Sequence, residues 1–222
     1  MAVRSTHFKQ LLLLATLSVM VLFSESAFGQ GEIKKIRKRT GRPEKWWAVC
    51  HPFIVKKAAR LTLETAKTLD SLKNAGTLDN DLTGGQLDAF KHSYWMALLS
   101  QNIKWKKAKK LGKAHEKSNY LSYKKALKKG RKNSHDKVAS DMDLWNNEKG
   151  IEIGRANKDA DRLTIQQIVI DSIKSGAMRI ILKNKEGKYI DCQHNEIPPD
   201  SLEGRWENAK CLVPSNSVGK RE

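Results

Sequence analysis

The sequence has little cysteine, little proline and few aromatic residues: three Cys, five Pro and 7% aromatics in 222 residues. Three cysteines allow at most one intramolecular disulfide, which excludes a small scaffold stapled by several disulfides. The sequence also lacks a His-Glu-x-x-His motif, a zinc-finger pattern, an RNA-recognition signature and a basic zipper. These absences exclude the commonest zinc-protease motif and disfavour sequence-specific recognition of nucleic acid.

Long apolar runs are absent except at the N-terminus. Arg4 and Lys9 precede an apolar segment from Leu11 to Phe23, and Ala27-Phe28-Gly29 has small residues at both cleavage-recognition positions. That segment is shorter than the roughly 20 apolar residues that span a bilayer. The order predicts a secretory signal peptide over residues 1–29, with an uncleaved anchor as the alternative. We therefore expect an exported bacterial protein, periplasmic or extracellular, with no transmembrane segment after cleavage.

Acidic residues are in the minority: 42 Lys and Arg against 24 Asp and Glu give a net charge of +18. Such an excess favours an anionic partner, such as a phospholipid surface, an envelope glycan or nucleic acid bound without sequence specificity. Between Lys104 and Lys132 thirteen basic residues accompany a single acid, Glu116. This stretch predicts either a surface that binds phosphates or a solvated helix face.

The remaining pattern predicts a mainly α protein: a helical bundle with a small C-terminal β-hairpin. Residues 30–45 are basic with almost nothing to bury, so we expect a disordered arm. A helical domain follows over residues 46–190, and residues 191–222 form an irregular tail. Helices are expected over 52–75, after a Thr83-x-x-Gln86 capping box, over 104–117, after a cap at Ser140, and from Thr164 to Gly176. Residues 177–182 and 187–190 are expected to form the hairpin.

The three cysteines are Cys50, Cys192 and Cys211. Cys192 and Cys211 are close in sequence and flank an irregular stretch, so a disulfide between them is favoured. Cys50 stands among aromatic residues, and we expect it to be a small buried hydrophobe. A disulfide between Cys50 and one of the tail cysteines stays open as the competing pairing.

Three short segments place polar side chains inside apolar helical patterns. They are Asp88-Ala-Phe-Lys-His92-Ser-Tyr-Trp95, Ala114-His115-Glu116 and Met142-Asp143-Leu-Trp-Asn146-Asn147. Asp88 and His92 are four residues apart, as are Asp143 and Asn147, so each pair projects from one face of a helix. If the three helices pack together, these groups converge on one site.

Two chemistries and one structural alternative fit this set. The first is binding of a divalent metal cofactor, with candidate ligands His92, His115 and Asp143. The second is metal-free acid–base attack of water on an ester or phosphodiester, with candidate catalytic residues His92, His115, Glu116 and Asp143. For both, the candidate substrate-binding residues are Asp88, Lys91, Trp95, Asn146 and Asn147. The structural alternative is a polar core whose groups satisfy one another.

The same three segments resemble the motifs of a family of uncharacterised bacterial proteins, many of them exported. That family has Asp-Ala-Phe-Arg-His-x-x-Trp, Ala-His-Glu and Met-Asp-Leu-x-Asn-Asn-x-x-Gly-Arg, and the resemblance covers roughly residues 80–185. This chain has Lys91 where the family has Arg, and Ile151 follows Gly150, with the Arg displaced to Arg155. Lys lacks the bidentate fork of Arg. The resemblance implies a shared domain and the site residues, and no established reaction.

Two functions therefore follow as hypotheses. One is a hydrolase, metal-dependent or His/Asp acid–base, that acts on an anionic extracytoplasmic substrate such as a phosphodiester, a phospholipid or an envelope polymer. The other is a non-catalytic module that binds anionic envelope surfaces or polyanions through its Lys-rich face. Whether the chain is an enzyme is thus left to the geometry of the site.

Overall fold

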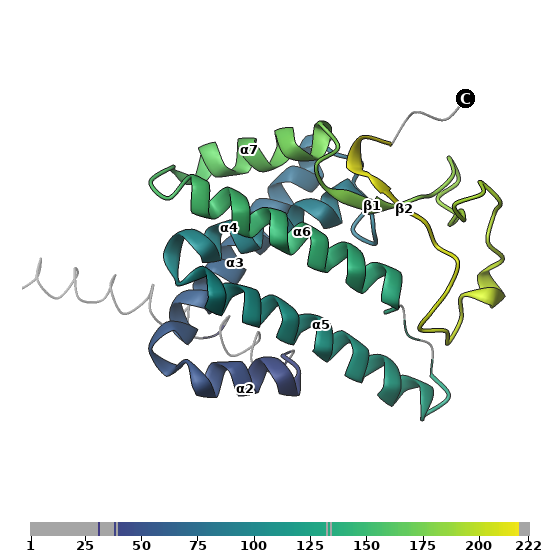
Figure 1. The fold of residues 1–222 in the computed structure, drawn as a ribbon, viewed down its shortest axis with the longest axis horizontal. Helices are drawn as coiled ribbons and strands as arrows, with labels where there is room; N and C mark the ends of the chain where they lie inside the picture. The colour runs from purple at the N-terminus through teal and green to yellow at the C-terminus, as the bar shows by residue number, and fades with distance from the viewer. Residues whose placement is uncertain (1–30, 32–37, 39, 132, 134, 218–222) are drawn as a thin grey trace, which may run out of the picture. The chain divides into compact units, whose positions relative to one another are not determined.

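The computed structural model describes residues 31, 38, 40–131, 133 and 135–217, and the predicted signal peptide lies outside them. Contacts divide the chain into two units, residues 1–39 and residues 40–222, and the second holds every element named below. It is mainly α with a small antiparallel sheet, which confirms the predicted fold class (Figure 1). The elements are α2 (Arg42–Cys50), α3 (Pro52–Ala75), α4 (Gln86–Asn102), α5 (Trp105–Leu127), α6 (Lys137–Ala156), α7 (Arg162–Lys174), β1 (Arg179–Ile181) and β2 (Leu212–Pro214), with 3₁₀ turns at Pro199–Ser201 and Ser215–Ser217.

Helix α4 is the centre of the bundle. It contacts α3, α5, α6, α7 and β1, and most of its residues are buried. A helix that is apolar on all sides is stable only inside a core, and α4 fits this rule with Leu87, Phe90 and Leu98 fully buried. Polar side chains on α4 are therefore also enclosed. Within the described ranges, no helix is long and apolar enough to cross a membrane.

Two glycines let α6 cross α4 at very short range. A Cβ added at Gly150 would lie 2.1 Å from the Ser93 carbonyl oxygen, and one at Gly154 would lie 2.2 Å from the Ala97 carbonyl oxygen. Since ordinary carbon contacts begin near 3.4 Å, only glycine permits this approach at the two positions. Because Gly150 and Gly154 are one turn apart, they form one smooth stripe on α6. The close crossing brings the N-terminal half of α6 against the polar face of α4.

The helix starts differ from those predicted. The Thr83-x-x-Gln86 capping box is wrong: α4 begins at Gln86, and the Asp79 carboxylate accepts the N–H groups of Gln86 and Leu87. The cap of α6 is Asp136, which accepts the Ala139 N–H, whereas Ser140 lies inside the helix. In both places an Asp earlier in the chain supplies the cap, as its acceptor chemistry favours. Helix α5 also continues to Leu127, ten residues beyond the predicted end at 117.

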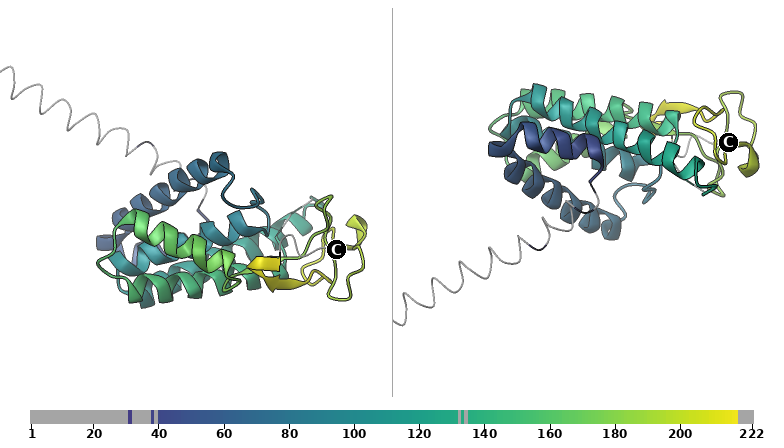
Figure 2. Two further views of the ribbon diagram at one scale, coloured as in Figure 1. Left: turned by 90° about the horizontal axis from the view of Figure 1, so that it is seen from above. Right: turned by 90° about the horizontal axis from the view of Figure 1, so that it is seen from below.

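The small sheet pairs distant segments. β1 runs antiparallel to β2, with Ile180 opposite Val213. The expected turn over 184–187 is present, with the Ile190 N–H donating to the Leu182 carbonyl, but residues 187–190 pair there only through the isolated Lys183–Tyr189 bridge, and the strand partner of β1 is β2. A disulfide joins Cys192 to Cys211, the pairing favoured by their spacing, with Cα atoms 5.0 Å apart. Figure 2 shows the strands and the irregular C-terminal segment at one end of the helices.

The region around α2 corrects two further expectations. Helix α2 begins at Arg42, after a Gly41 whose N–H donates to Glu44, so a disordered arm that reaches residue 45 is wrong over its last turn. Cys50 is an exposed free thiol rather than a buried one. Of the neighbouring tryptophans, Trp47 is buried and donates to the Lys107 carbonyl at 3.1 Å, whereas Trp46 points outward. Burial of one tryptophan thus leaves the Cys50 side of the helix in solvent.

Candidate functional site

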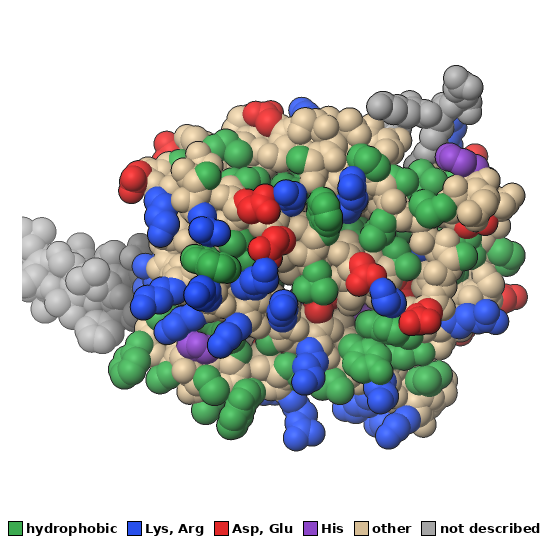
Figure 3. All heavy atoms as spheres, in the orientation of Figure 1, with side chains coloured by type: hydrophobic (Ala, Val, Ile, Leu, Met, Phe, Trp, Pro, Cys, Tyr) green, Lys and Arg blue, Asp and Glu red, His purple; other side chains and the backbone are tan. Residues whose placement is uncertain are grey.

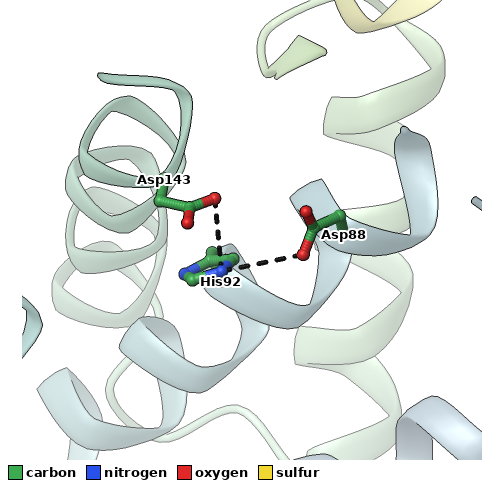
Figure 4. Close-up of side chains that lie close together, drawn as sticks. All are labelled: Asp88, His92 and Asp143. Atoms are coloured by element: carbon green, nitrogen blue, oxygen red, sulfur yellow. Dashed lines mark ion pairs between the residues drawn. The ribbon is translucent and has the colours of Figure 1, made fainter. Parts of the chain in front are cut away.

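Asp88, His92 and Asp143 form a buried cluster between α4 and α6. Asp88 and His92 come from one face of α4, and Asp143 faces them from α6 (Figure 4). His92 Nε2 lies 3.2 Å from Asp143 Oδ1 and 3.7 Å from Asp88 Oδ1. One ligand atom from each residue lies within 4.8 Å of the others. Within the described part of the chain, this is the one such group of three His, Cys, Asp or Glu side chains.

His92 and Asp143 carry unusual protonation. Burial lowers the pKa of His92 well below its ordinary range, and the positive charges of Lys91 and His115 lower it further. Burial raises the pKa of Asp143 well above its ordinary range, and Asp88 and Glu116 add to the effect because like charges repel. His92 is therefore held neutral. The cluster favours the uncharged form of Asp143 unless another cation joins it.

Two buried polar atoms of this cluster have no protein partner. Among the described residues, Asp143 Oδ1 and Glu116 Oε1 make no hydrogen bond, whereas the His92 ring has the Asn147 side chain as its hydrogen-bonding neighbour. Asp143 Oδ1 is close to His92 Nε2, but outside hydrogen-bond geometry. Buried polar groups are nearly always hydrogen-bonded, so a concentration of exceptions points to a bound species. A mutually satisfied polar core would leave Asp143 Oδ1 and Glu116 Oε1 without a partner among the described residues.

Lys91 supplies the nearest cation. Its Nζ lies 2.5 Å from Asp88 Oδ1, while the other Asp88 oxygen accepts the Gly84 N–H at 2.9 Å. Burial opposes the charge of Lys91, but Asp88 and the other nearby carboxylates outweigh burial and raise the Lys91 pKa. The Lys91 side chain is 39% exposed. The charged Lys91 side chain thus extends from the cluster towards solvent.

His115 belongs to a second pair beside the cluster. Its Nδ1 lies 2.8 Å from Glu44 Oε1 on α2, and its ring centroid lies 6.2 Å from that of His92. Burial would lower the His115 pKa, but the hydrogen bond and charge of Glu44 raise it. Burial would raise the Glu44 pKa, but His115 and the Gly41 N–H lower it. The two histidines therefore differ: the surroundings lower the pKa of His92, whereas Glu44 raises the pKa of His115.

Glu116 and Asn147 line the other side of the cluster. Glu116 Oε2 accepts from the Ser140 hydroxyl at 2.9 Å and from the Asn119 amide at 3.2 Å. Burial raises the Glu116 pKa, partly offset by the charge of His115. Asn147 packs against Gly112 of α5, where an added Cβ would lie 3.1 Å from the Asn147 amide nitrogen. Glu116 Oε1 stays without a hydrogen-bond partner among the described residues.

Asn146 and Trp95, both expected as substrate-binding residues, make contacts within the protein. The Asn146 side chain donates to the Arg179 carbonyl and accepts the Arg179 N–H, both at 2.9 Å, so it ties α6 to β1. Trp95 donates its indole N–H to the Thr62 hydroxyl at 3.0 Å and presents its ring to His115 at 5.8 Å. The Asn146 amide is thus engaged by the β1 backbone, and Trp95 packs beside the His115 ring.

Sequence reasoning missed Glu44, which it placed in the basic arm. The helix signal was nevertheless present: Pro43 follows Arg42, proline favours the first turn of a helix, and acids favour the same turn. The sequence proposed His92, His115 and Asp143 as candidate metal ligands, and the structure groups two of them with Asp88. His115 is engaged by Glu44, and Asp88 stands with His92 and Asp143 instead.

The fold and the site together define the class of this protein. It is a helical domain with a buried carboxylate–histidine cluster between two closely crossed helices. Residues 45–177 match the family described as Domain of unknown function (DUF6973), and the chain belongs to that family. This stretch begins at Lys45 inside α2 and ends at Ala177, before β1, so it contains His92, His115 and the helices α4, α5 and α6. Comparison with curated proteins and with solved structures finds no match.

Proposed function

We propose that the protein is a metal-dependent hydrolase of an anionic, phosphate-containing substrate, with Asp88, His92 and Asp143 as metal ligands. The observation that carries the proposal is the gathering of three ligand atoms from two helices within 4.8 Å in a buried place. An ion there gives Asp143 Oδ1 the partner that it lacks among the described residues. It also offsets the repulsion between the two carboxylates.

The separations suit one ion. Donor atoms that hold a tetrahedral metal at about 2.0–2.1 Å lie about 3.3 Å apart. His92 Nε2 is 3.2 Å and 3.7 Å from the two carboxylate oxygens, so small side-chain movements complete the geometry. Three protein ligands leave a fourth position open for water, as in catalytic zinc sites. When bound, the ion supplies a Lewis acid and lowers the pKa of that water.

The surrounding residues suit this role. A histidine ligand must be neutral, and burial keeps His92 so. The Asn147 amide, which lies beside the His92 ring, is the acceptor that would hold Nδ1–H and fix the tautomer. The Lys91 ammonium reaches from Asp88 to solvent, where its charge favours an anionic substrate.

His115 is the proposed general acid. Glu44 raises the pKa of His115, which favours the imidazolium form that can protonate a leaving group. Two histidines whose environments push their pKa values apart are the usual sign of divided roles in acid–base chemistry. Glu44 positions the ring through Nδ1, which leaves Nε2 as the atom that releases the proton.

The test measures bound metal and hydrolysis in the same preparations. Wild type, His92→Ala and Asp143→Asn are dialysed against Zn²⁺ or Mn²⁺, and ions per chain are counted. Asp141→Asn is the matched control, since Asp141 is an exposed acid on the same helix, paired with Lys137. We expect one ion in wild type and in the control. Loss of a ligand lowers affinity by more than the roughly 10–100-fold that loss of an outer-shell partner costs.

Hydrolysis of bis(p-nitrophenyl) phosphate is followed in parallel, with and without chelator. The proposal expects activity that depends on the ion, on His92 and on Asp143. Activity that needs His92 and Asp143 but survives chelation would replace it by metal-free acid–base catalysis. If wild type neither binds an ion nor cleaves the ester, the hydrolase proposal is wrong and the non-catalytic binding module is the function that remains.

That second function is favoured by one surface of α5. Leu121, Lys124, Lys125, Lys128 and Lys129 are exposed and line a shallow hollow near the C-terminal end of the helix. A module that binds polyanions here releases counterions, so its affinity falls steeply with salt. Retention on heparin above about 0.2 M salt, lost when the four lysines become Gln, would support it. Elution of wild type below about 0.2 M salt would contradict this second function.

We also propose that the chain acts outside the cytosol. The charged and apolar leader over residues 1–29 supports export with cleavage before Gln30. N-terminal sequencing of the protein recovered from the periplasm or medium tests this. A product that begins at Gln30 supports cleavage, and intact protein confined to the cytosol contradicts export.

A further inference from the structure

The corner between α2 and α3 exposes large apolar side chains to an unusual degree. Phe53 is 98% exposed, Trp46 is 71% exposed and Val49 is 69% exposed. Cys50, between them in sequence, is exposed too. Helix α2 lies along the lower edge of the view in Figure 1 and turns into α3 at Pro52. Exposed side chains of this size, grouped over a few residues, mark an interaction site rather than ordinary surface.

Packing shows that this exposure does not arise from a loosely held helix. Trp47 is buried, donates to the Lys107 carbonyl and stacks on His51 with ring centroids 4.7 Å apart. Glu44 anchors the same helix to His115. The inner face of α2 is thus fixed to α5, and its outer face is held rigidly in solvent.

Positive charges surround the apolar side chains. The exposed cations of this corner are Arg42, Lys45, Lys56, Lys57 and Arg60. The only acid between residues 40 and 63 is Glu44, and its carboxylate is engaged by His115 and Gly41. In Figure 3, hydrophobic side chains gather at the lower left of the view, over α2, with Lys and Arg side chains next to them. Apolar and aromatic tips ringed by cations, without free acid, match an anionic lipid interface.

We infer that the α2–α3 corner is a docking surface for anionic phospholipid bilayers. Trp46, Val49 and Phe53 enter the boundary between headgroups and acyl chains, and the five cations contact lipid phosphates. Tryptophan suits this place because its ring is apolar and its indole N–H stays hydrated. Basic residues next to a membrane add attraction that falls off with salt. This inference concerns a surface apart from the metal cluster and does not depend on the proposed hydrolysis.

Cys50 makes a direct test available. Among the described residues it is the one free thiol, and it lies within the corner, so a polarity-sensitive maleimide dye can be attached there. The labelled protein is titrated with vesicles of phosphatidylglycerol and phosphatidylcholine, and separately with phosphatidylcholine alone. We expect a blue shift of the dye and co-sedimentation with the anionic vesicles, both weakened by salt. No shift and no co-sedimentation would overturn the inference.

Matched variants separate this corner from other surfaces. A Trp46→Ser/Phe53→Ser variant should bind anionic vesicles at least about tenfold more weakly, since each ring buries a large apolar area on insertion. Leu163→Ser is the control, because Leu163 is 74% exposed on α7, remote in sequence. Co-sedimentation of unlabelled protein checks that the dye does not create the affinity.

Three other outcomes would also overturn the inference. The first is a Leu163→Ser variant that loses vesicle binding as much as Trp46→Ser/Phe53→Ser does. The second is wild type that is retained on heparin but does not bind vesicles. The third is a wild-type dimer that does not bind vesicles and that Trp46→Ser/Phe53→Ser disrupts. Vesicle binding that depends only on the α5 lysines would move the docking surface to α5. Circular dichroism of each variant verifies that the helices are intact.

Discussion

Replacing Gly150 by Ala should separate the two helices that form the site. An added Cβ would lie 2.1 Å from the Ser93 carbonyl oxygen and 2.8 Å from the Ser93 carbonyl carbon. Those atoms belong to the backbone of buried α4, so they move only if the helix moves. Restoring ordinary contact requires the distance to grow from 2.1 Å towards 3.4 Å. Interiors are packed too closely to absorb such a shift locally.

The magnitude follows from two opposing effects. Overpacking costs about 1–3 kcal/mol, and a backbone clash belongs at the upper end. Alanine offsets about 1 kcal/mol of this because it is the better helix former. We expect a net loss of about 2 kcal/mol, which lowers the midpoint of thermal unfolding by about 4–8 °C in a domain of this size. Moving α6 also carries Asp143 away from His92, so metal binding should weaken.

Gly112→Ala is the matched control. An added Cβ there would meet side-chain ends, the Asn147 amide nitrogen at 3.1 Å and Met96 Cε at 3.2 Å, which can turn aside. Thermal unfolding of both variants, monitored by circular dichroism, gives the comparison. A Gly150→Ala protein as stable as wild type would show that the close crossing of α4 and α6 is not required, and the reasoning would fail.

Three further predictions follow. Asp143→Asn should raise the unfolding midpoint of chelator-treated protein, because it removes a buried carboxylate that Asp88 and Glu116 repel; a lower midpoint would contradict that repulsion. Glu44→Gln should lower the His115 pKa measured by NMR. Because the folded His115 pKa is raised, the stability that Glu44 provides is present below pH 6.5 and is lost as pH rises through the folded pKa; an unchanged titration would separate the pair. One thiol, Cys50, should react with a thiol reagent in the folded protein before reduction, and a second reactive thiol would mean that the Cys192–Cys211 disulfide is open.

The sequence predicts those parts of the site that depend on local helix geometry. Asp88 and His92, one turn apart, share a face of α4 as expected. Asn146 and Asn147 show the limit of such patterns. Adjacent residues on a helix point about 100° apart, so one of them reaches the Arg179 backbone while the other borders the cluster.

Contacts between segments far apart in the sequence could not be predicted from local residue patterns. Glu44 and His115 are 71 residues apart, and nothing in either segment specifies the packing of α2 on α5. The same holds for β1, whose partner β2 lies beyond the expected hairpin. Cys50 was expected to be buried because of its aromatic neighbours, but Trp46 and Phe53 point outward with it. Trp47 rather than Trp46 is buried because Trp47 packs on α5 and donates to the Lys107 carbonyl.

The charges inside the bundle argue against a purely structural core. Asp88, Asp143 and Glu116 are buried together with the His92 imidazole, and among the described residues Lys91 is the Lys or Arg that pairs with an oxygen of these three acids. Replacing buried charges by packed apolar residues is often neutral or stabilising, so packing alone gives no reason to keep three carboxylates here. His115 does not resolve the imbalance, because Glu44 engages it. Three buried carboxyl groups thus stand near the place where the ligand atoms of Asp88, His92 and Asp143 converge, and the divalent cation that we propose there would favour the ionised form of Asp143.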